Sequence, residues 1–176
     1  MSDIVHRLWQ HHPGGNLLDV GVGGAALAGI AVDYGYRVCG LDLHRGYAER
    51  LRRLGVEFLH GDICGYDFGG QQFDIIVMGD VLEHVAEPRR ALAQAASVLA
   101  GNGLLWLSTP DYEGGWTRML GDGDPMWMEG EHLQYFCQDS LRRLLAEQGL
   151  AVIDYRLSER FKGCMEVLCA RNSLGG

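Results

Sequence analysis

Short apolar runs alternate with segments of helical periodicity through the first two thirds of the chain. Strands are predicted where the apolar runs are nearly continuous, at residues 17–20, 37–41, 57–59, 73–78 and 104–108. Helices are predicted between them at 25–34, 47–54 and 88–100, with glycines 35, 55 and 101 at their carboxyl ends. Because strands that alternate with helices through short links pair in parallel, the pattern predicts a mainly parallel sheet with helices on both faces.

The final third of the chain has a different pattern. Residues 111–136 are rich in Gly, Trp and Met and show little periodicity. A capped helix is predicted from Asp139 to Gly149, and two strands at 151–157 and 166–170 are predicted to form an antiparallel pair. The chain has no internal repeat or long linker, so we expect a single α/β domain over residues 1–176, with a short helix within 1–15.

Composition narrows the class of protein. The formal net charge is −8, which disfavours nucleic acid as a partner because phosphates require basic groups. The sequence has no apolar run of the roughly 20 residues that a membrane span needs, and no secretory signal. Its cysteines form no Cys-x-x-Cys pair, which favours buried thiols in a reducing compartment over disulfides or a zinc site. We therefore expect a cytoplasmic protein without a membrane segment.

The most informative motif follows the first predicted strand. Asp19 ends the apolar run and precedes a turn that contains Gly21, Gly23 and Gly24. Glycines let the backbone turn tightly into a helix and approach a ligand closely. A carboxylate beside such a turn repels phosphate and attracts a cation, so the sequence predicts a ligand that carries positive charge.

Two further acids follow the next predicted strands. Asp42 lies about twenty residues after the glycine turn, the spacing expected of an acid that binds ribose hydroxyls. Asp62 follows the third strand, where it can accept a hydrogen bond from an adenine amino group. Each acid alone is also consistent with a turn or a helix cap. As a set at successive strand ends, they predict a nucleoside site at one edge of the sheet.

This ordered set resembles the class I S-adenosylmethionine-dependent methyltransferases, in particular small single-domain members of the type 11 and 23 groups. The resemblance spans nearly the whole chain, from Leu17 to Arg171, with one departure at Ala25, where a third glycine is usual. The segments that carry it are 19–24 (Asp-Val-Gly-Val-Gly-Gly), 41–43 (Leu-Asp-Leu), 61–63 (Gly-Asp-Ile), 73–76 (Phe-Asp-Ile-Ile), 80–85 (Asp-Val-Leu-Glu-His-Val) and 104–110.

The resemblance implies a Rossmann-like doubly wound sheet of seven strands in the order 3-2-1-4-5-7-6, with strand 7 antiparallel. It also implies S-adenosylmethionine as cofactor and S-adenosylhomocysteine as product. Asp19 and the glycine turn would hold the methionine portion, Asp42 the ribose, and Asp62 with Ile63 the adenine. The full set of expected cofactor-binding residues is Asp19, Gly21, Val22, Gly23, Asp42, Leu43, Gly61, Asp62, Ile63, Gly79 and Asp80.

Candidate catalytic residues follow the fourth strand. Glu83 and His84 should lie beside the reacting sulfur, and a histidine suits a general base at neutral pH. The alternative is that this pair only begins the next helix and orders its loop. His132 joins them through a second resemblance, in which Asp80, Glu83 and His84 match the Glu-x-x-Glu-His segment that binds a divalent metal in ubiquinone-pathway and small-RNA methyltransferases. A divalent metal is therefore possible, but the shorter Asp80 and the broader family pattern favour a metal-free site.

The aromatic and Met-rich segment suggests where the acceptor binds. Residues 111–136 follow the fifth strand, so we expect a lid or wall there for an apolar or aromatic acceptor, with core packing or a dimer contact as the alternative. The acidic chain favours a small-molecule or saccharide-like acceptor; the atom methylated is open. Few residues precede the first strand, which suggests an open pocket or a cap lent by a partner chain or a homodimer.

Two other functions compete with this one. A nicotinamide-dependent oxidoreductase uses a similar glycine turn, but Asp19 and Asp62 argue against it. A non-catalytic module that binds S-adenosylmethionine or its product is the other alternative.

Overall fold

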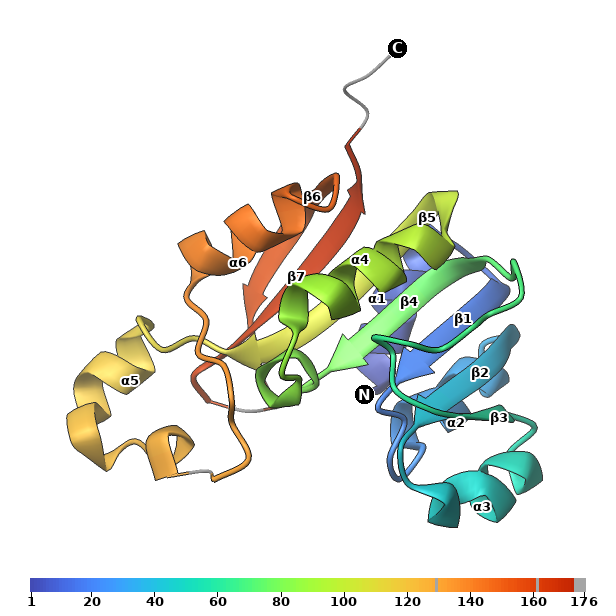
Figure 1. Ribbon diagram of the computed structural model, residues 1–176, viewed down its shortest axis with the longest axis horizontal. Coiled ribbons are helices and arrows are strands. Elements are labelled where there is room, and N and C mark those ends of the chain that lie inside the picture. The colour runs from blue at the N-terminus through green and yellow to red at the C-terminus, as the bar shows by residue number, and fades with distance from the viewer. Residues whose placement is uncertain (129, 161, 173–176) are drawn as a thin grey trace.

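A computed structural model describes residues 1–128, 130–160 and 162–172 (Figure 1). One sheet of seven strands runs through it in the order β3-β2-β1-β4-β5-β7-β6, as the resemblance implies. The strands are β1 (Gly15–Val20), β2 (Tyr36–Asp42), β3 (Glu57–His60), β4 (Phe73–Gly79), β5 (Leu99–Pro110), β6 (Leu150–Leu157) and β7 (Cys164–Arg171). The first five pair in parallel, and β7 lies antiparallel to both β5 and β6.

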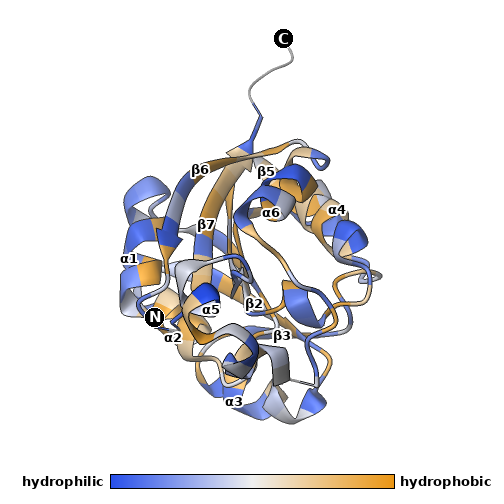
Figure 2. Ribbon diagram, turned by 90° about the vertical axis from the view of Figure 1, so that its left-hand side faces the viewer, coloured by the Kyte–Doolittle hydropathy of each residue, from blue (hydrophilic) through white to orange (hydrophobic). Residues whose placement is uncertain are grey.

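Helices cover both faces of the sheet (Figures 1 and 2). The α-helices are α1 (Ser2–His11), α2 (Ala26–Asp33), α3 (Ala48–Arg53), α4 (Pro88–Val98), α5 (Gly115–Leu120) and α6 (Gln138–Ala146). Short 3₁₀ turns are η1 (Arg45–Tyr47), η2 (Leu82–His84), η3 (Gly121–Gly123) and η4 (Pro125–Met128). None of the helices in the described segments has the length and hydropathy to cross a bilayer.

The alternation of side chains along the strands divides the core in two. Leu17 and Ile75 point to the face covered by α1, α2 and α3, whereas Leu18 and Ile76 point to the face covered by α4 and α6. All four side chains are fully buried, and burial stabilises the fold by about 1.5–3 kcal/mol for each such side chain. Burial on both faces explains why the central strands are apolar without interruption.

The carboxyl ends of the parallel strands meet at one edge of the sheet. There the chain enters the glycine turn after β1, the loops after β2 and β3, and η2 after β4. The segment with α5, η3 and η4 extends from the end of β5, and Figure 1 shows it projecting beyond the sheet. Because β7 runs antiparallel to β5, the link between β6 and β7 returns to this same edge.

The structure corrects three predicted details. The helix predicted for 88–100 ends at Val98, because Leu99 already pairs with Phe73 as the start of β5. Gly101 therefore lies within a strand and ends no helix. The helix predicted from Asp139 begins at Gln138, and Cys137 is its N-cap, with the backbone N–H of Cys137 donating to Ser140 Oγ at 2.9 Å.

Candidate functional site

The turn after β1 is held open by left-handed backbone conformations. Gly21, Gly23 and Ala25 have φ angles of 69°, 47° and 62°. A Cβ on Gly21 would lie 2.7 Å from Val81 Cγ2, so that position requires glycine for space as well as conformation. Ala25 adopts the third left-handed conformation despite its methyl group, which costs about 1–2 kcal/mol. The turn keeps its geometry although one of the usual glycines is missing.

Two clefts lie at this edge of the sheet, and both are lined by Gly21 and Asp80. The first cleft, of about 240 Å³, is lined by Val20, Gly21, Leu41, Asp42, Leu43, Gly61, Asp62, Ile63, Asp80, Val81, His84 and Val85. The second cleft, of about 320 Å³, is lined by Met1, Asp19, residues 21–27, Val77, Gly79, Asp80, Trp106 and Arg160. All the sequence-predicted cofactor residues line one cleft or both.

Backbone amides orient the two acids of the first cleft. Asp42 accepts hydrogen bonds from the backbone N–H groups of Gly23 at 2.9 Å and His44 at 2.8 Å, so it joins the end of β2 to the glycine turn. Asp62 accepts one from the backbone N–H of Cys64 at 2.9 Å. A carboxylate has about four acceptor positions, so both acids retain capacity for further donors.

Asp19 is the buried acid of the second cleft. Its exposed fraction is 5%, and burial, with a smaller contribution from the charge of Asp42, raises the pKa of the Asp19 carboxyl to about 7. A cation beside it would favour the ionised form and lower that pKa. The cleft is thus suited to a ligand that brings positive charge.

Asp80 lies between the two clefts. It has a positive φ of 54°, a conformation that Asp tolerates better than most residues. Ser108 Oγ donates to Asp80 Oδ1 at 2.6 Å, and Arg160 Nη2 donates to Asp80 Oδ2 at 2.7 Å. Sequence reasoning missed Arg160, because it lies in the polar link between β6 and β7, where no motif marks it.

Glu83, His84 and His132 come together as predicted, although His132 is far away in the sequence. One ligand atom from each lies within 4.8 Å of the others, and the two imidazole centroids are 4.8 Å apart. The backbone N–H groups of Leu133 and Gln134 donate to the carbonyl of Glu83 at 2.8 and 3.0 Å, which joins the two segments. Asp80 is not part of this group.

Hydrogen bonds determine how His84 presents its ring. His84 Nδ1 lies 3.1 Å from the carbonyl oxygen of Glu131, which can only accept. Neutral His84 therefore carries its proton on Nδ1 and has its lone pair on Nε2. Glu83 is 1% exposed, and burial raises the pKa of its carboxyl to about 7.

The same three residues fit a divalent metal. Oε2 of Glu83 is buried without a hydrogen-bond partner among the described residues. A backbone carbonyl that orients an imidazole through Nδ1 is also a common arrangement behind metal-binding histidines. One carboxylate and two imidazoles suit a borderline transition metal such as Zn²⁺ better than Mg²⁺, which prefers oxygen ligands.

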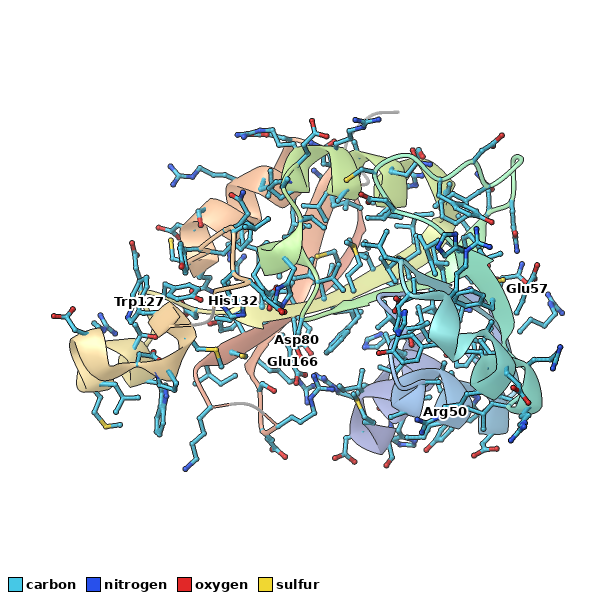
Figure 3. All side chains as sticks on the ribbon, turned by 60° about the horizontal axis from the view of Figure 1, so that its bottom comes forward. Arg50, Glu57, Asp80, Trp127, His132 and Glu166 are labelled. Carbon is cyan, nitrogen blue, oxygen red and sulfur yellow. The ribbon has the colours of Figure 1, made fainter. Side chains whose placement is uncertain are left out.

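Three rings pack together near His132 and form what we call the aromatic cluster, in which Tyr112 contacts the histidine: Tyr112, Trp127 and Tyr135. Tyr112 is buried, with its ring centroid 4.4 Å from those of both partners. Trp127 and Tyr135 are 41% and 47% exposed, and Figure 3 shows Trp127 beside His132. The hydroxyl of Tyr112 lies 2.8 Å from His132 Nδ1. Phe136, by contrast, belongs to the core, and the side chain of Met128 lies outside the described residues.

The chain is similar to known proteins in sequence and in fold. The family model described as "Methyltransferase domain" matches residues 1–155. The ubiquinone biosynthesis O-methyltransferase of Coxiella burnetii is 32% identical over 103 residues, which are 54% of this chain and 44% of that protein. The enzyme of the same name from Dinoroseobacter shibae is 29% identical over 151 residues, covering 78% of this chain and 60% of that protein. The matches thus cover about half the length of these curated relatives.

Solved structures share the fold at low sequence identity. The methyltransferase CcbJ from Streptomyces caelestis superposes with a TM-score of 0.80 at 16% identity, over 97% of this chain and 94% of that one. Magnesium protoporphyrin IX methyltransferase from Synechocystis gives a TM-score of 0.78 at 18% identity, over 96% and 80% of the two chains. Similarity at this level establishes the fold.

Proposed function

Because this chain belongs to the methyltransferase-domain family, we propose that it transfers the methyl group of S-adenosylmethionine to a small-molecule acceptor. The observation that carries the proposal is the pair of clefts that meet at Gly21 and Asp80. The first cleft has the acids and apolar walls that an adenosine requires. The second has a buried acid where a cationic group would lie. A ligand with a nucleoside at one end and a charged tail at the other fits both.

Each part of the cofactor has residues to hold it. Asp42 would bind the ribose hydroxyls, and Asp62 with Ile63 the adenine, with Leu43 and Gly61 completing that wall. Asp19 and the turn residues Gly21, Val22 and Gly23, together with Gly79 and Asp80, would hold the methionine portion. S-adenosylmethionine supplies a methyl group already activated by a cationic sulfur, so the protein has to align the acceptor and remove its proton.

His84 is the proposed general base. It lines the first cleft, and its neutral form presents the Nε2 lone pair. Glu83 lies beneath it, and His132 lies edge to face against its ring. Because the pKa of Glu83 is raised to about 7, we propose that Glu83 holds the cluster together in its neutral form below that pH and stabilises a protonated His84 above it.

The aromatic cluster is the proposed wall for the acceptor. Its exposed rings, Trp127 and Tyr135, pack against Tyr112, whose hydroxyl meets His132. They offer apolar surface on which a planar or saccharide ring can stack. The curated relatives carry names that refer to ubiquinone biosynthesis, which supports a small-molecule acceptor here.

Calorimetric titration of Asp42→Ala with S-adenosylhomocysteine tests the cofactor site. The variant removes the carboxylate that meets the ribose and also orients the glycine turn, so affinity should fall at least about tenfold. Asp67→Ala is the matched control, because Asp67 also accepts a backbone N–H in a loop, at 2.8 Å from Gly69, but lines neither cleft. Equal affinity of both variants would refute the assignment. If the wild-type protein binds NAD and does not bind S-adenosylhomocysteine, the oxidoreductase alternative is favoured.

Metal titration separates the proposed base from a metal-assisted site. Although three residues fit a metal, Asp80 is bound to Ser108 and Arg160 and does not join them, so we favour the metal-free base. We therefore expect Zn²⁺, Mn²⁺ and Mg²⁺ to produce no heat of binding that depends on His84 and His132. Binding that His84→Ala and His132→Ala both abolish would instead assign the cluster to a metal, which would acidify an acceptor hydroxyl. Tight product binding without methyl transfer to any phenol, amine or saccharide tested would favour the non-catalytic module.

A further inference from the structure

The second cleft contains both signs of charge. Asp19 and Asp80 line it, and Arg160 is the one lysine or arginine side chain that does so among the described residues. Arg160 reaches the cleft from the link between β6 and β7, 80 residues along the chain from Asp80. An acidic cleft would bind a simple cation, whereas a cleft with an arginine as well is matched to a ligand that carries a carboxylate beside an ammonium group.

The Arg160 guanidinium is placed by several contacts. Nη2 donates to Asp80 Oδ2 at 2.7 Å, and Ser108 in turn orients Asp80. The backbone N–H of Arg160 donates to Ser158 Oγ at 3.2 Å. Nη1 lies 2.7 Å from the sulfur of Met1, and a thioether is a weak acceptor. A carboxylate oxygen in place of that sulfur would make a much stronger, charge-assisted bond.

We infer that Arg160 binds the carboxylate of the amino-acid portion of the cofactor, with Asp80 positioning its guanidinium and Asp19 facing the ammonium group. This inference rests on the proposed function. It gives the link between β6 and β7 a role in cofactor binding that no sequence motif marks. It also explains why Asp80 is held by two partners in a left-handed conformation at the point where the clefts join.

The test compares two ligands that differ only in the amino-acid portion. S-adenosylhomocysteine has it, whereas 5′-methylthioadenosine lacks it and should occupy only the first cleft, whose described lining does not include Arg160. In calorimetric titrations, Arg160→Ala should lower the affinity for S-adenosylhomocysteine by roughly 10- to 100-fold and leave the affinity for 5′-methylthioadenosine unchanged. Arg160→Lys should fall between, because lysine keeps the charge but loses the planar fork.

Two further variants separate a contact with the carboxylate from a general loss of positive charge and from repulsion by Asp80. Arg156→Ala removes an arginine of β6 that pairs with Asp154 and does not line the second cleft, so both affinities should remain at the wild-type values. The double variant Asp80→Asn/Arg160→Ala should keep the selective loss. If the double variant instead recovers affinity for S-adenosylhomocysteine, the loss in Arg160→Ala came from repulsion by Asp80 after its arginine partner was removed. That result would overturn the inference.

The remaining outcomes are also decisive. Wild-type affinity in Arg160→Ala would refute a contact with the carboxylate, and an equal loss of both ligands would assign Arg160 a purely structural role. If the wild-type protein binds neither ligand, the proposed function fails and this inference fails with it. If it binds both and Arg160→Ala loses neither, only this inference fails.

Discussion

Replacing Asp19 with Asn should reduce the loss of stability that the ligand-free protein undergoes as the pH rises. Asp19 is 5% exposed, and burial raises the pKa of its carboxyl from 3.8 to about 7, with Asp42 adding a smaller repulsion. Folding therefore opposes ionisation of this group. The ionised form of Asp19 is therefore unfavourable in the ligand-free protein, and a cationic ligand beside it would stabilise that form.

The direction and size of this change in the free energy of unfolding follow from the difference in proton binding between the folded and unfolded chains. Below pH 3.8 the carboxyl is protonated in both the folded and the unfolded chain, and its contribution to stability is fully present. As the pH rises from 3.8 toward about 7, the unfolded chain ionises and the folded chain does not, so stability falls. The loss amounts to 1.36 kcal/mol for each pH unit and stops near pH 7, where the folded chain also ionises. The roughly two units between pH 5 and pH 7 therefore cost about 3 kcal/mol, and little is added up to pH 8. Asn at this position cannot ionise, so the loss disappears.

Urea denaturation at pH 5 and pH 8 measures this difference. The free energy of unfolding of Asp19→Asn should fall between these pH values by about 3 kcal/mol less than that of the wild-type protein. Glu83, whose pKa is also raised to about 7, contributes equally to both proteins and cancels. Asp122→Asn, at an exposed position in η3, is the control and should follow the wild-type protein. If Asp19→Asn and the wild-type protein lose the same stability between pH 5 and pH 8, the reasoning is wrong.

Two other variants test the turn and the acceptor wall. Gly40→Ala should lower the free energy of unfolding by about 1–3 kcal/mol, because the new Cβ would lie 2.9 Å from Val22 Cγ2. Gly101→Ala is the control and should change it by less than about 0.5 kcal/mol, because nothing lies within 4 Å of its Cβ. Equal effects of the two variants in urea denaturation would contradict this reasoning. Trp127→Ala should raise the KM for an acceptor, with S-adenosylhomocysteine affinity unchanged, while Trp9→Ala, 40% exposed on α1, should change neither. A loss of product affinity in Trp127→Ala would argue against an acceptor wall.

Much of the cleft lining could be predicted from the sequence, because the residues proposed to bind the cofactor follow strands. Asp19, Asp42 and Asp62 each come after an apolar run, and parallel strands bring their carboxyl ends to one edge. Position in the sequence was therefore sufficient to place them together. The two boundary errors have different causes. Strand pairing of Leu99 ended the helix that was predicted to reach Gly101, and the capping contact between Cys137 and Ser140 started the next helix one residue before Asp139.

Periodicity and the residues next to strand ends were enough to predict a mainly parallel sheet, the glycine turn and the acids along the first cleft, and the resemblance added the strand order. Which distant residues complete the site depends on tertiary packing. Antiparallel pairing of β7 with β5 brings Arg160 to Asp80, and the return of the chain after η4 brings His132 to both His84 and Tyr112. Such contacts depend on how the layers pack, and local sequence carries no record of that packing.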